Sequence, residues 1–257
     1  MVGPVKNIRA ILSPAELPAL RQSDLSRSVC VVFDILRATS TFVTALHQGA
    51  ARIIPVSDIA EALAWREKEP QTLLAGERDG VRISAAQTGS IAFDLGNSPR
   101  EFGPEIVRGR TIVSTTTNGT RALNACSAAA AVLAGSFLNL GATARYIQNS
   151  PAEDILLVCA GTGPFAALED VLAAGALTQR LLAALGECAL ADSAAIAWRT
   201  FLPVENHLAA VLPTTDNGRR LMAIPELRDD VAFCAQTDVY PLVAGQTADG
   251  LQQLKVL

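Results

Sequence analysis

The chain has 257 residues, half of them hydrophobic, and a formal net charge of −4 at pH 7. This length and composition allow a sizeable core, and we predict a single α/β domain over residues 1–257. No basic stripe is present, so the electrostatic footprint of a nucleic-acid-binding protein is absent. A small anionic ligand would therefore have to be bound by local dipoles, particular arginines or a metal ion.

Hydrophobic runs alternate with polar turns as far as residue 185. Short continuous β-branched runs are typical of strands buried on both faces, and longer amphipathic runs are typical of helices. This alternation predicts an α/β fold with a largely parallel sheet and helices on both faces. The expected strands are 29–35, 52–56, 72–75, one from 111, 130–133 and 155–159, and the expected helices are 41–48, 58–69, one after 119, 142–148 and 165–185.

Three segments do not follow this alternation. Residues 76–104 are rich in Gly, Ser, Asp and Pro and hold no period, which is typical of a functional or mobile connection. Residues 121–145 carry no charge between their terminal arginines, but polar residues and glycines interrupt them. We therefore expect a helix, a strand and a loop of a soluble core there, and no contact with a membrane. From about residue 186 onward we predict a mostly helical part of the domain.

The cysteines and the N-terminus indicate a cellular compartment. The five cysteines include no Cys-x-x-Cys pair, which indicates reduced thiols. Lys6 and Arg9 are followed by proline and acidic residues rather than by an apolar leader. Both features predict a cytoplasmic protein. Cys159 ends a strand beside a glycine-rich turn and is either a nucleophile or a small buried hydrophobic residue.

Three polar turns, 34–40, 114–120 and 160–164, each follow a predicted buried strand. Ligands of open α/β sheets bind at the carboxyl ends of the strands, so we expect the three turns to meet at one edge. The second turn is the richest in donors, although capping a helix needs only one hydroxyl. We predict that it binds an oxyanion at the positive end of the next helix, through Thr115, Thr116, Thr117, Asn118 and Gly119.

Asp34 and Arg37 carry the chemistry of the first turn. A carboxylate at the end of a buried strand is costly unless it binds a metal, pairs with a cation or acts as a nucleophile. Arg37 can clamp a phosphate with its planar fork of donors, and Thr39 and Ser40 add hydroxyls as candidate substrate contacts. The alternative is that Asp34 and Arg37 pair with each other and that the hydroxyls only cap the helix.

Carboxylates near the other strands predict a Mg²⁺ site. Mg²⁺ takes one or two carboxylates, water and substrate phosphate as ligands, and the residues by themselves do not choose among the candidates. Acidic residues at a helix start are also common for dipole reasons alone. In the irregular segment, Asn97 and Ser98 are candidate substrate contacts. The candidate oxygen ligands are Asp34, Glu77, Asp94, Glu169 and Asp170.

Several familiar signatures are missing. The turn Gly161-Thr162-Gly163-Pro164 lacks the third glycine of a dinucleotide-binding fingerprint, and no P-loop is present. His47 and His207 are the two histidines, and neither has metal-ligand spacing. Nothing marks a serine for a catalytic triad with either of them.

Six segments, in order along the chain, resemble the signatures of a known family. The resemblance runs from about Val29 to Asp170 and is to the 2-phosphosulfolactate phosphatases, the ComB family of Mg²⁺-dependent acid phosphatases. The segments are Phe33–Thr41, Phe93–Pro99, Thr115–Thr120, Gly135–Asn139, Val158–Gly161 and Leu168–Asp170.

This resemblance implies an α/β fold of the family's own topology, Mg²⁺ as the cofactor and a homo-oligomer, which we expect to be a dimer. It also implies hydrolysis of the phosphate monoester of a 2-hydroxy acid, a small anionic substrate. The named substrate is 2-phospho-3-sulfolactate, which gives 3-sulfolactate and phosphate on the route to coenzyme M. With this activity in view, we predict catalytic roles for Asp34, Arg37 and Glu169 and metal binding by Asp34, Glu77, Asp94 and Asp170.

Two mechanisms and two rival classes stay open. Asp34 either holds a metal that activates water or attacks phosphorus itself. We favour the activated water because the Asp-x-Asp signature of a better-known aspartyl-phosphate class is missing. An oxidoreductase with a nucleotide cofactor would fit the sheet, and a non-catalytic anion-binding protein would use the same turns without a metal.

Overall fold

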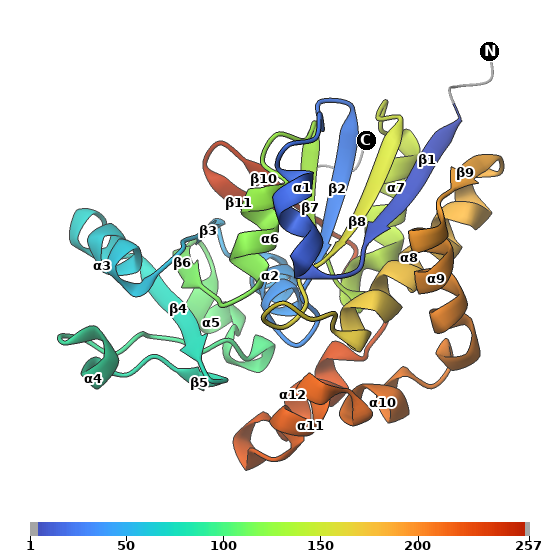
Figure 1. Ribbon diagram of the computed structural model, residues 1–257. Helices are drawn as coiled ribbons and strands as arrows, with labels where there is room; N and C mark the ends of the chain where they lie inside the picture. Colours follow the sequence, from blue (N-terminus) through green and yellow to red (C-terminus); the bar gives the residue numbers. More distant parts are fainter. Residues whose placement is uncertain (1–4, 255–257) are drawn as a thin grey trace.

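A computed structural model, in which residues 5–254 are described, contains an open sheet of eleven strands with helices on both faces (Figure 1). The strand order is β5-β4-β6-β3-β11-β10-β7-β2-β8-β1-β9. The predicted α/β class with a mostly parallel sheet is confirmed. The strands are β1 Lys6–Ile11, β2 Ser28–Phe33, β3 Arg52–Pro55, β4 Leu73–Arg78, β5 Val81–Arg82, β6 Thr111–Thr115, β7 Ala131–Gly135, β8 Asp154–Cys159, β9 Cys188–Leu190, β10 Val243–Thr247 and β11 Gly250–Leu254.

The helices cover the sheet and extend beyond it at one end, where α10 to α12 lie below the strands in Figure 1. None of the described helices is long and apolar enough to cross a membrane. The α-helices are α1 Leu17–Leu20, α2 Ala38–His47, α3 Ile59–Lys68, α4 Ala85–Thr88, α5 Pro104–Val107, α6 Gly119–Ala125, α7 Leu140–Asn149, α8 Leu168–Leu185, α9 Asp192–Phe201, α10 Leu208–Val211, α11 Asp216–Met222 and α12 Arg228–Cys234.

The sheet consists of two parallel blocks joined by a hairpin. Strands β4, β6 and β3 form one block, and β7, β2, β8, β1 and β9 form the other. The hairpin β10–β11 lies between them, pairing antiparallel with β7 on one side and with β3 on the other. Because the strand direction reverses at three successive antiparallel contacts, the two blocks run in opposite senses.

This arrangement differs from the single parallel edge that the sequence suggested. In a flat sheet, opposite senses would put the carboxyl ends of β6 and β2 at opposite edges. From β6 to β2 the sheet has five steps between neighbouring strands. With an ordinary twist of about 20–25° at each step, β2 is rotated by roughly 100–125° relative to β6. Figure 1 accordingly shows β4 and β2 both running towards the bottom of the view. The turns after β2, β6 and β8 therefore still meet around one cavity.

Strand β2 shows why the central strands have continuous hydrophobic sequences. Its side chains alternate between two cores, with Val31 and Phe33 on the face covered by α7, α8 and α9, and with Cys30 and Val32 on the face covered by α2 and α6. All four are fully buried. Burial on both faces removes the polar alternation of a half-exposed strand.

Side chains cap the first turns of two helices. Asp58 accepts a hydrogen bond from the Glu61 N–H at 2.9 Å and begins α3 as expected. In a full capping box the Glu61 carboxylate would accept from the Asp58 N–H. Here it accepts from the N–H of the preceding residue, Ser57. Thr215 accepts from the Gly218 N–H at 3.0 Å and begins α11.

Five of the described strands, β1, β5, β9, β10 and β11, were not predicted. β1 and β9 extend the sheet beyond β8, the short β5 pairs with β4, and the hairpin β10–β11 lies in the region predicted to be helical. The chain after residue 186 is thus helical in its middle but not at its two ends. In β1, the polar Asn7 and Arg9 alternate with the buried Ile8 and Ala10, which is a strand signal in the sequence.

The buried hairpin residue Leu251 should be important for stability. It pairs with Ile53 where β11 meets β3 and is fully buried. Leu251→Ala should lower the free energy of unfolding by about 2–5 kcal/mol, because it leaves a cavity between the two blocks. Urea denaturation followed by circular dichroism measures the loss. The matched control is Gln253→Ala, whose exposed side chain should change stability by less than about 0.5 kcal/mol. Equal losses would show that the hairpin does not join the blocks in this way.

Candidate active site

One cavity of about 130 Å³ lies where the turns after β2, β6 and β8 meet, and the β4–β5 turn and α11 close it. Two of its lining side chains are hydrophobic and most of the others are polar or charged. Such a lining suits a small, charged ligand. The lining residues are Asp34, Leu36, Arg37, Glu77, Asp79, Gly80, Asn97, Thr116, Thr117, Asn118, Gly161, Thr162, Gly163, Glu169, Asp170, Asn217, Arg220 and Leu221.

Asp34 follows the carboxyl end of β2 and lies among the other carboxylates of the cavity. Burial raises the pKa of its carboxyl group to about 7. The backbone N–H groups of Ala38 and Gly119 oppose this shift, and the charges of Glu77 and Glu169 add to it. The Ala38 N–H lies 3.4 Å from Asp34 Oδ1 at the start of α2. Asp34 is thus held at the starts of two helices and faces two other acids.

Gly119 allows α6 to approach Asp34 this closely. A Cβ at this position would lie 3.0 Å from Asp34 Oδ2 and 3.1 Å from Ala38 Cβ. The helix start that was predicted to bind a substrate oxyanion therefore faces the protein's own carboxylate. Gly119 itself does not line the cavity, whereas Thr116, Thr117 and Asn118 do.

Asp170, in the first turn of α8, connects two of the turns. Its Oδ1 accepts from the Ile35 N–H at 2.8 Å, and its Oδ2 accepts from the Gly161 N–H at 2.9 Å. The turn after β2 is thereby fastened to the turn after β8. Burial raises the pKa of Asp170 well above its ordinary value, and Asp34 and Glu169 act in the same direction. The two N–H groups oppose them by stabilising the ionised form.

Helix α11 brings Asn217 and Arg220 to the cavity, and neither is among the site residues predicted from the sequence. Asn217 Nδ2 donates to Glu169 Oε1 at 2.6 Å and to Thr162 Oγ1 at 2.7 Å. Its Oδ1 accepts from Arg220 Nη2 at 3.2 Å. The available signal was a capped helix start, Thr215, followed closely by an arginine pair. Only the fold shows that this helix faces the turns after β2 and β8.

Glu77 connects the β4–β5 turn to the turn after β6. Its Oε2 accepts from the Gly80 N–H at 2.8 Å, and its Oε1 accepts from Thr117 Oγ1 at 3.0 Å. The predicted threonine turn therefore binds a protein carboxylate through one of its hydroxyls. Thr116 keeps its side chain at the cavity wall beside this contact.

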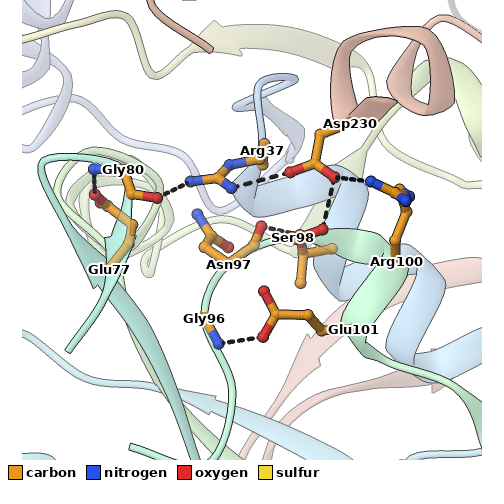
Figure 2. Close-up of polar contacts among 10 residues, drawn as sticks. Arg37, Glu77, Gly80, Gly96, Asn97, Ser98, Arg100, Glu101 and Asp230 are labelled. Atoms are coloured by element: carbon orange, nitrogen blue, oxygen red, sulfur yellow. Dashed lines mark hydrogen bonds and ion pairs between the residues drawn. The ribbon is translucent and has the colours of Figure 1, made fainter. Parts of the chain in front are cut away.

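Arg37 is held by a buried ion pair that the sequence did not reveal. Figure 2 shows its guanidinium between Gly80 and Asp230. Arg37 Nη1 donates to Asp230 Oδ2 at 3.0 Å, and Nη2 donates to the Gly80 carbonyl at 2.7 Å. The other oxygen of Asp230 accepts from Ser98 Oγ at 2.6 Å and lies 3.7 Å from Arg100 Nη1. The alternative in which Arg37 pairs with Asp34 is therefore wrong.

Asp94 is the one predicted metal ligand that lies away from the cavity. Its Oδ2 pairs with Arg66 of α3 and accepts from the Leu74 N–H at 2.7 Å. These contacts fix the irregular loop against β4. Asp94 therefore has a structural environment, whereas the other predicted ligands Asp34, Glu77 and Asp170 line the cavity.

Four of the predicted hydroxyl contacts also lie behind the cavity wall. Their oxygen atoms are used by neighbouring groups that shape the turns. Thr39 Oγ1 accepts from the Asp34 N–H, and Thr115 Oγ1 accepts from Arg78. Ser40 contacts the Ile35 carbonyl and Ser136, and Ser98 donates to Asp230. Of the predicted loop contacts, Asn97 alone lines the cavity.

The charge and donor types of the cavity fit a divalent cation. Five carboxylates and two guanidinium groups line it, which gives a formal charge of −3 when all are ionised. In the part of the chain that the structure describes, Asn118 Oδ1 is buried and has no hydrogen-bond partner. No three acidic, His or Cys side chains of residues 5–254 form a ready-made cage. Mg²⁺ suits such a site because it takes few protein oxygens and keeps water and phosphate as ligands.

Cys159 has the environment of a structural residue. It is fully buried at the end of β8 and does not line the cavity. Burial raises the pKa of its thiol well above the ordinary value, and the charge of Asp170 adds to this. A protonated, enclosed thiol does not act as a nucleophile. All five cysteines are free thiols.

Comparison with known proteins shows the family. A family model described as 2-phosphosulpholactate phosphatase matches residues 15–249. The chain belongs to this family. It is 45% identical to a protein of Deinococcus radiodurans over 216 aligned residues, and these make up 84% of this chain and 86% of the relative. It is 42% identical over 213 residues to a Thermotoga petrophila protein (83% and 86%) and 38% identical over 227 residues to a Caldanaerobacter subterraneus protein (88% and 90%).

Each of these three relatives bears the name probable 2-phosphosulfolactate phosphatase. The family match spans every segment that lines the cavity, from the turn after β2 to α11. The whole cavity, including the α11 wall, thus belongs to the shared part of the chain.

The buried pair between Arg37 and Asp230 should dominate the stability of the α12 segment. Asp230→Asn should lower the free energy of unfolding by about 3–5 kcal/mol, because it leaves the Arg37 guanidinium buried without its counter-charge. Urea denaturation measures this loss. The matched control is the neighbouring Asp229→Asn, whose side chain is 76% exposed and should contribute less than about 1 kcal/mol. Similar effects of both variants would contradict this role of Asp230.

The raised pKa of Asp34 predicts that this residue lowers the free energy of unfolding of the metal-free protein by an amount that depends on pH. In the unfolded chain this group ionises near its ordinary pKa of 3.8, but in the folded chain it ionises near pH 7. The folded state therefore binds the extra proton between these values, and the contribution of Asp34 to stability falls as pH rises through this window. The stability of Asp34→Asn relative to the wild type should increase between about pH 5 and pH 8.

Urea denaturation at several pH values, after removal of divalent cations, measures this difference. The exposed Asp192→Asn, outside the cavity, is the control and should show a flat difference from the wild type. A flat difference for Asp34→Asn as well would mean that burial beside acidic neighbours does not raise the pKa of Asp34 in the folded protein.

Proposed function

We propose that this protein is a Mg²⁺-dependent phosphatase that hydrolyses the phosphate monoester of a 2-hydroxy acid. The observation that supports this most is the convergence of five carboxylates and two guanidinium groups in one small cavity. The family match and the names of the relatives support 2-phospho-3-sulfolactate as the substrate. Its products would be 3-sulfolactate and phosphate, as on the route to coenzyme M.

The electrostatics support a role for the cation. A substrate with phosphate, carboxylate and sulfonate groups would be repelled by a cavity of net negative charge. Asp34 is the first candidate ligand because the negative charges of both Glu77 and Glu169 act on its carboxyl group, and a cation bound there would relieve this repulsion. Asp170 and the unpaired amide oxygen of Asn118 are further candidates. Bound there, Mg²⁺ would neutralise charge on the phosphate as the ester bond breaks.

The two arginines supply the remaining donors. Arg220 contacts only the amide oxygen of Asn217 among the described residues, so most of its five N–H donors are free for an oxyanion. Arg37 uses two of its donors for Asp230 and Gly80 and is one of the residues that line the cavity. The two guanidinium groups come from different ends of the chain and can hold two acid groups of one substrate.

Hydrolysis adds a water oxygen to phosphorus and breaks the bond to the ester oxygen, which leaves with a proton. In this proposal Glu169 accepts the proton of the attacking water. Its Oε1 accepts from Asn217, and its Oε2 has no hydrogen-bond partner among the described residues. Asn217 thus orients the carboxylate and leaves one oxygen for catalysis. The alternative of attack by Asp34 would leave an aspartyl phosphate that rapid quenching can trap.

Neither rival class is favoured by the cavity. Its volume is about 130 Å³ and its lining has no aromatic side chain, which does not suit a nicotinamide or flavin ring. A non-catalytic anion-binding protein would have no use for so many carboxylates, because each repels the ligand.

The activity should depend on both the metal and Asp34. The purified protein should release inorganic phosphate from 2-phospho-3-sulfolactate with Mg²⁺, and EDTA should abolish the release. Asp34→Asn should lower kcat by about 10²-fold or more, because it removes a charged ligand or nucleophile from the reacting centre. Asp192→Asn is the exposed control and should retain activity. No turnover across a panel of 2-phospho acids, or full turnover in EDTA, would overturn the proposal.

The effect of Mg²⁺ on thermal stability distinguishes residues that bind the metal from residues that only support the fold. Mg²⁺ should raise the Tm of the wild type, since binding to the folded state stabilises it, and should raise that of Asp34→Asn much less. Asp94→Asn should keep the Mg²⁺ response, because Asp94 contacts Arg66 and β4 rather than the cavity. Loss of the response in Asp94→Asn would support the role that the sequence suggested for it.

A further inference from the structure

A second cavity, of about 320 Å³, lies on the other side of the turn after β6. It shares Thr116 and Thr117 with the carboxylate cavity and no other residue. These two threonines form the wall between the cavities. The lining residues of the second cavity, which we name the arginine pocket, are Arg21, Ser57, Arg78, Thr116, Thr117, Thr120, Arg121 and Asn124.

The arginine pocket has the opposite charge to its neighbour. Arg21 follows α1, Arg78 ends β4 and Arg121 lies in α6, so three distant parts of the sequence supply its cations. The other lining residues are hydroxyl or amide side chains, and none is a carboxylate. The formal charge of the lining is therefore +3 in a protein whose net charge is −4. Three like charges around one cavity repel each other unless an anion joins them.

None of the three guanidinium groups of the arginine pocket is paired with a carboxylate among the described residues. Within residues 5–254, the side chains of Arg21 and Arg121 have no hydrogen-bond or ion-pair partner, and both are exposed. Arg78 donates to the Glu77 carbonyl at 2.7 Å and to Thr115 Oγ1 at 3.3 Å, both uncharged acceptors. The pocket thus holds three uncompensated positive charges with free donors.

Buried hydroxyls complete the pocket. Thr116 and Thr120 are 5% and 1% exposed. Their Oγ1 atoms contact each other at 3.4 Å, and Thr116 Oγ1 receives the Thr120 N–H at 3.4 Å, which are long contacts for hydroxyl groups. Their hydrogen-bonding capacity is therefore largely unused inside the protein. Hydroxyl donors beside guanidinium groups are typical of sites for tetrahedral oxyanions.

We propose that the arginine pocket is a second ligand site, which binds a phosphate or sulfonate group. The carboxylate cavity repels a free oxyanion when it holds no cation, whereas the arginine pocket attracts one without any cofactor. This inference does not depend on the proposed activity. The oxyanion belongs either to a free anion or to the remote acid group of a substrate that reaches past the threonine wall, and the chemistry of recognition is the same for both.

Isothermal titration of metal-depleted protein with inorganic phosphate tests the proposal. The wild type should bind phosphate saturably, and the double variant Arg21→Gln/Arg121→Gln should bind it at least tenfold more weakly, because each lost charge-assisted contact is expected to cost about that factor or more. The matched control is Arg145→Gln/Arg199→Gln, which removes two other exposed arginines and should leave the affinity within about twofold.

Circular dichroism melting should show that both double variants fold, since all four side chains are exposed. No saturable binding by the wild type, or equal weakening in both double variants, would overturn the proposal. The KM for the phospho acid then identifies the source of the anion. A raised KM in Arg21→Gln/Arg121→Gln alone assigns the pocket to the substrate's remote acid group, and an unchanged KM with lost phosphate binding assigns it to a free anion.

Discussion

The crowding of carboxylates between the ends of β2, β4 and β8 is the constraint on which the rest of the site depends. Asp34 and Asp170 both have raised pKa values because they are buried close to other acids. The protein offsets part of this cost with backbone N–H groups, two on Asp170 and those at the starts of α2 and α6 on Asp34. The negative charge that these groups leave uncompensated favours positive charge in the cavity, which Arg37 and Arg220 supply in part and which the proposed metal ion would complete.

The C-terminal helices complete this site through polar contacts rather than through a hydrophobic interface alone. Asp230 of α12 holds Arg37, and Asn217 of α11 holds Glu169. Both contacts join a residue that follows a central strand, Arg37 after β2 and Glu169 in α8 after β8, to a segment 193 and 48 positions away in sequence, respectively. They fix two side chains of opposite charge on the same cavity, as binding the proposed anionic substrate together with a cation would require.

The turn after β6 separates two cavities of opposite charge. On one side Thr117 donates to Glu77 in the acidic cavity, and on the other side Thr116 and Thr120 face the arginine pocket. The sequence has more hydroxyls in this turn than helix capping needs, which predicted a bound ligand. In the structure one of these hydroxyls donates to the Glu77 carboxylate, and others line the arginine pocket. The fold uses one short loop to organise both sites.

The sequence by itself determined the α/β class, the strands buried on both faces and the three polar turns, and it offered Asp34, Glu77, Asp94, Glu169 and Asp170 as candidate carboxylates without choosing among them. These follow from local patterns, because hydrophobic period and turn chemistry act over a few residues. The tertiary structure alone decided that Asp94 lies outside the cavity, that Arg37 pairs with Asp230 and that α11 forms a wall. It also decided that the hairpin β10–β11 joins two blocks of opposite sense. Such pairings join residues distant in sequence, and which acid meets which base depends on the twist and order of the strands.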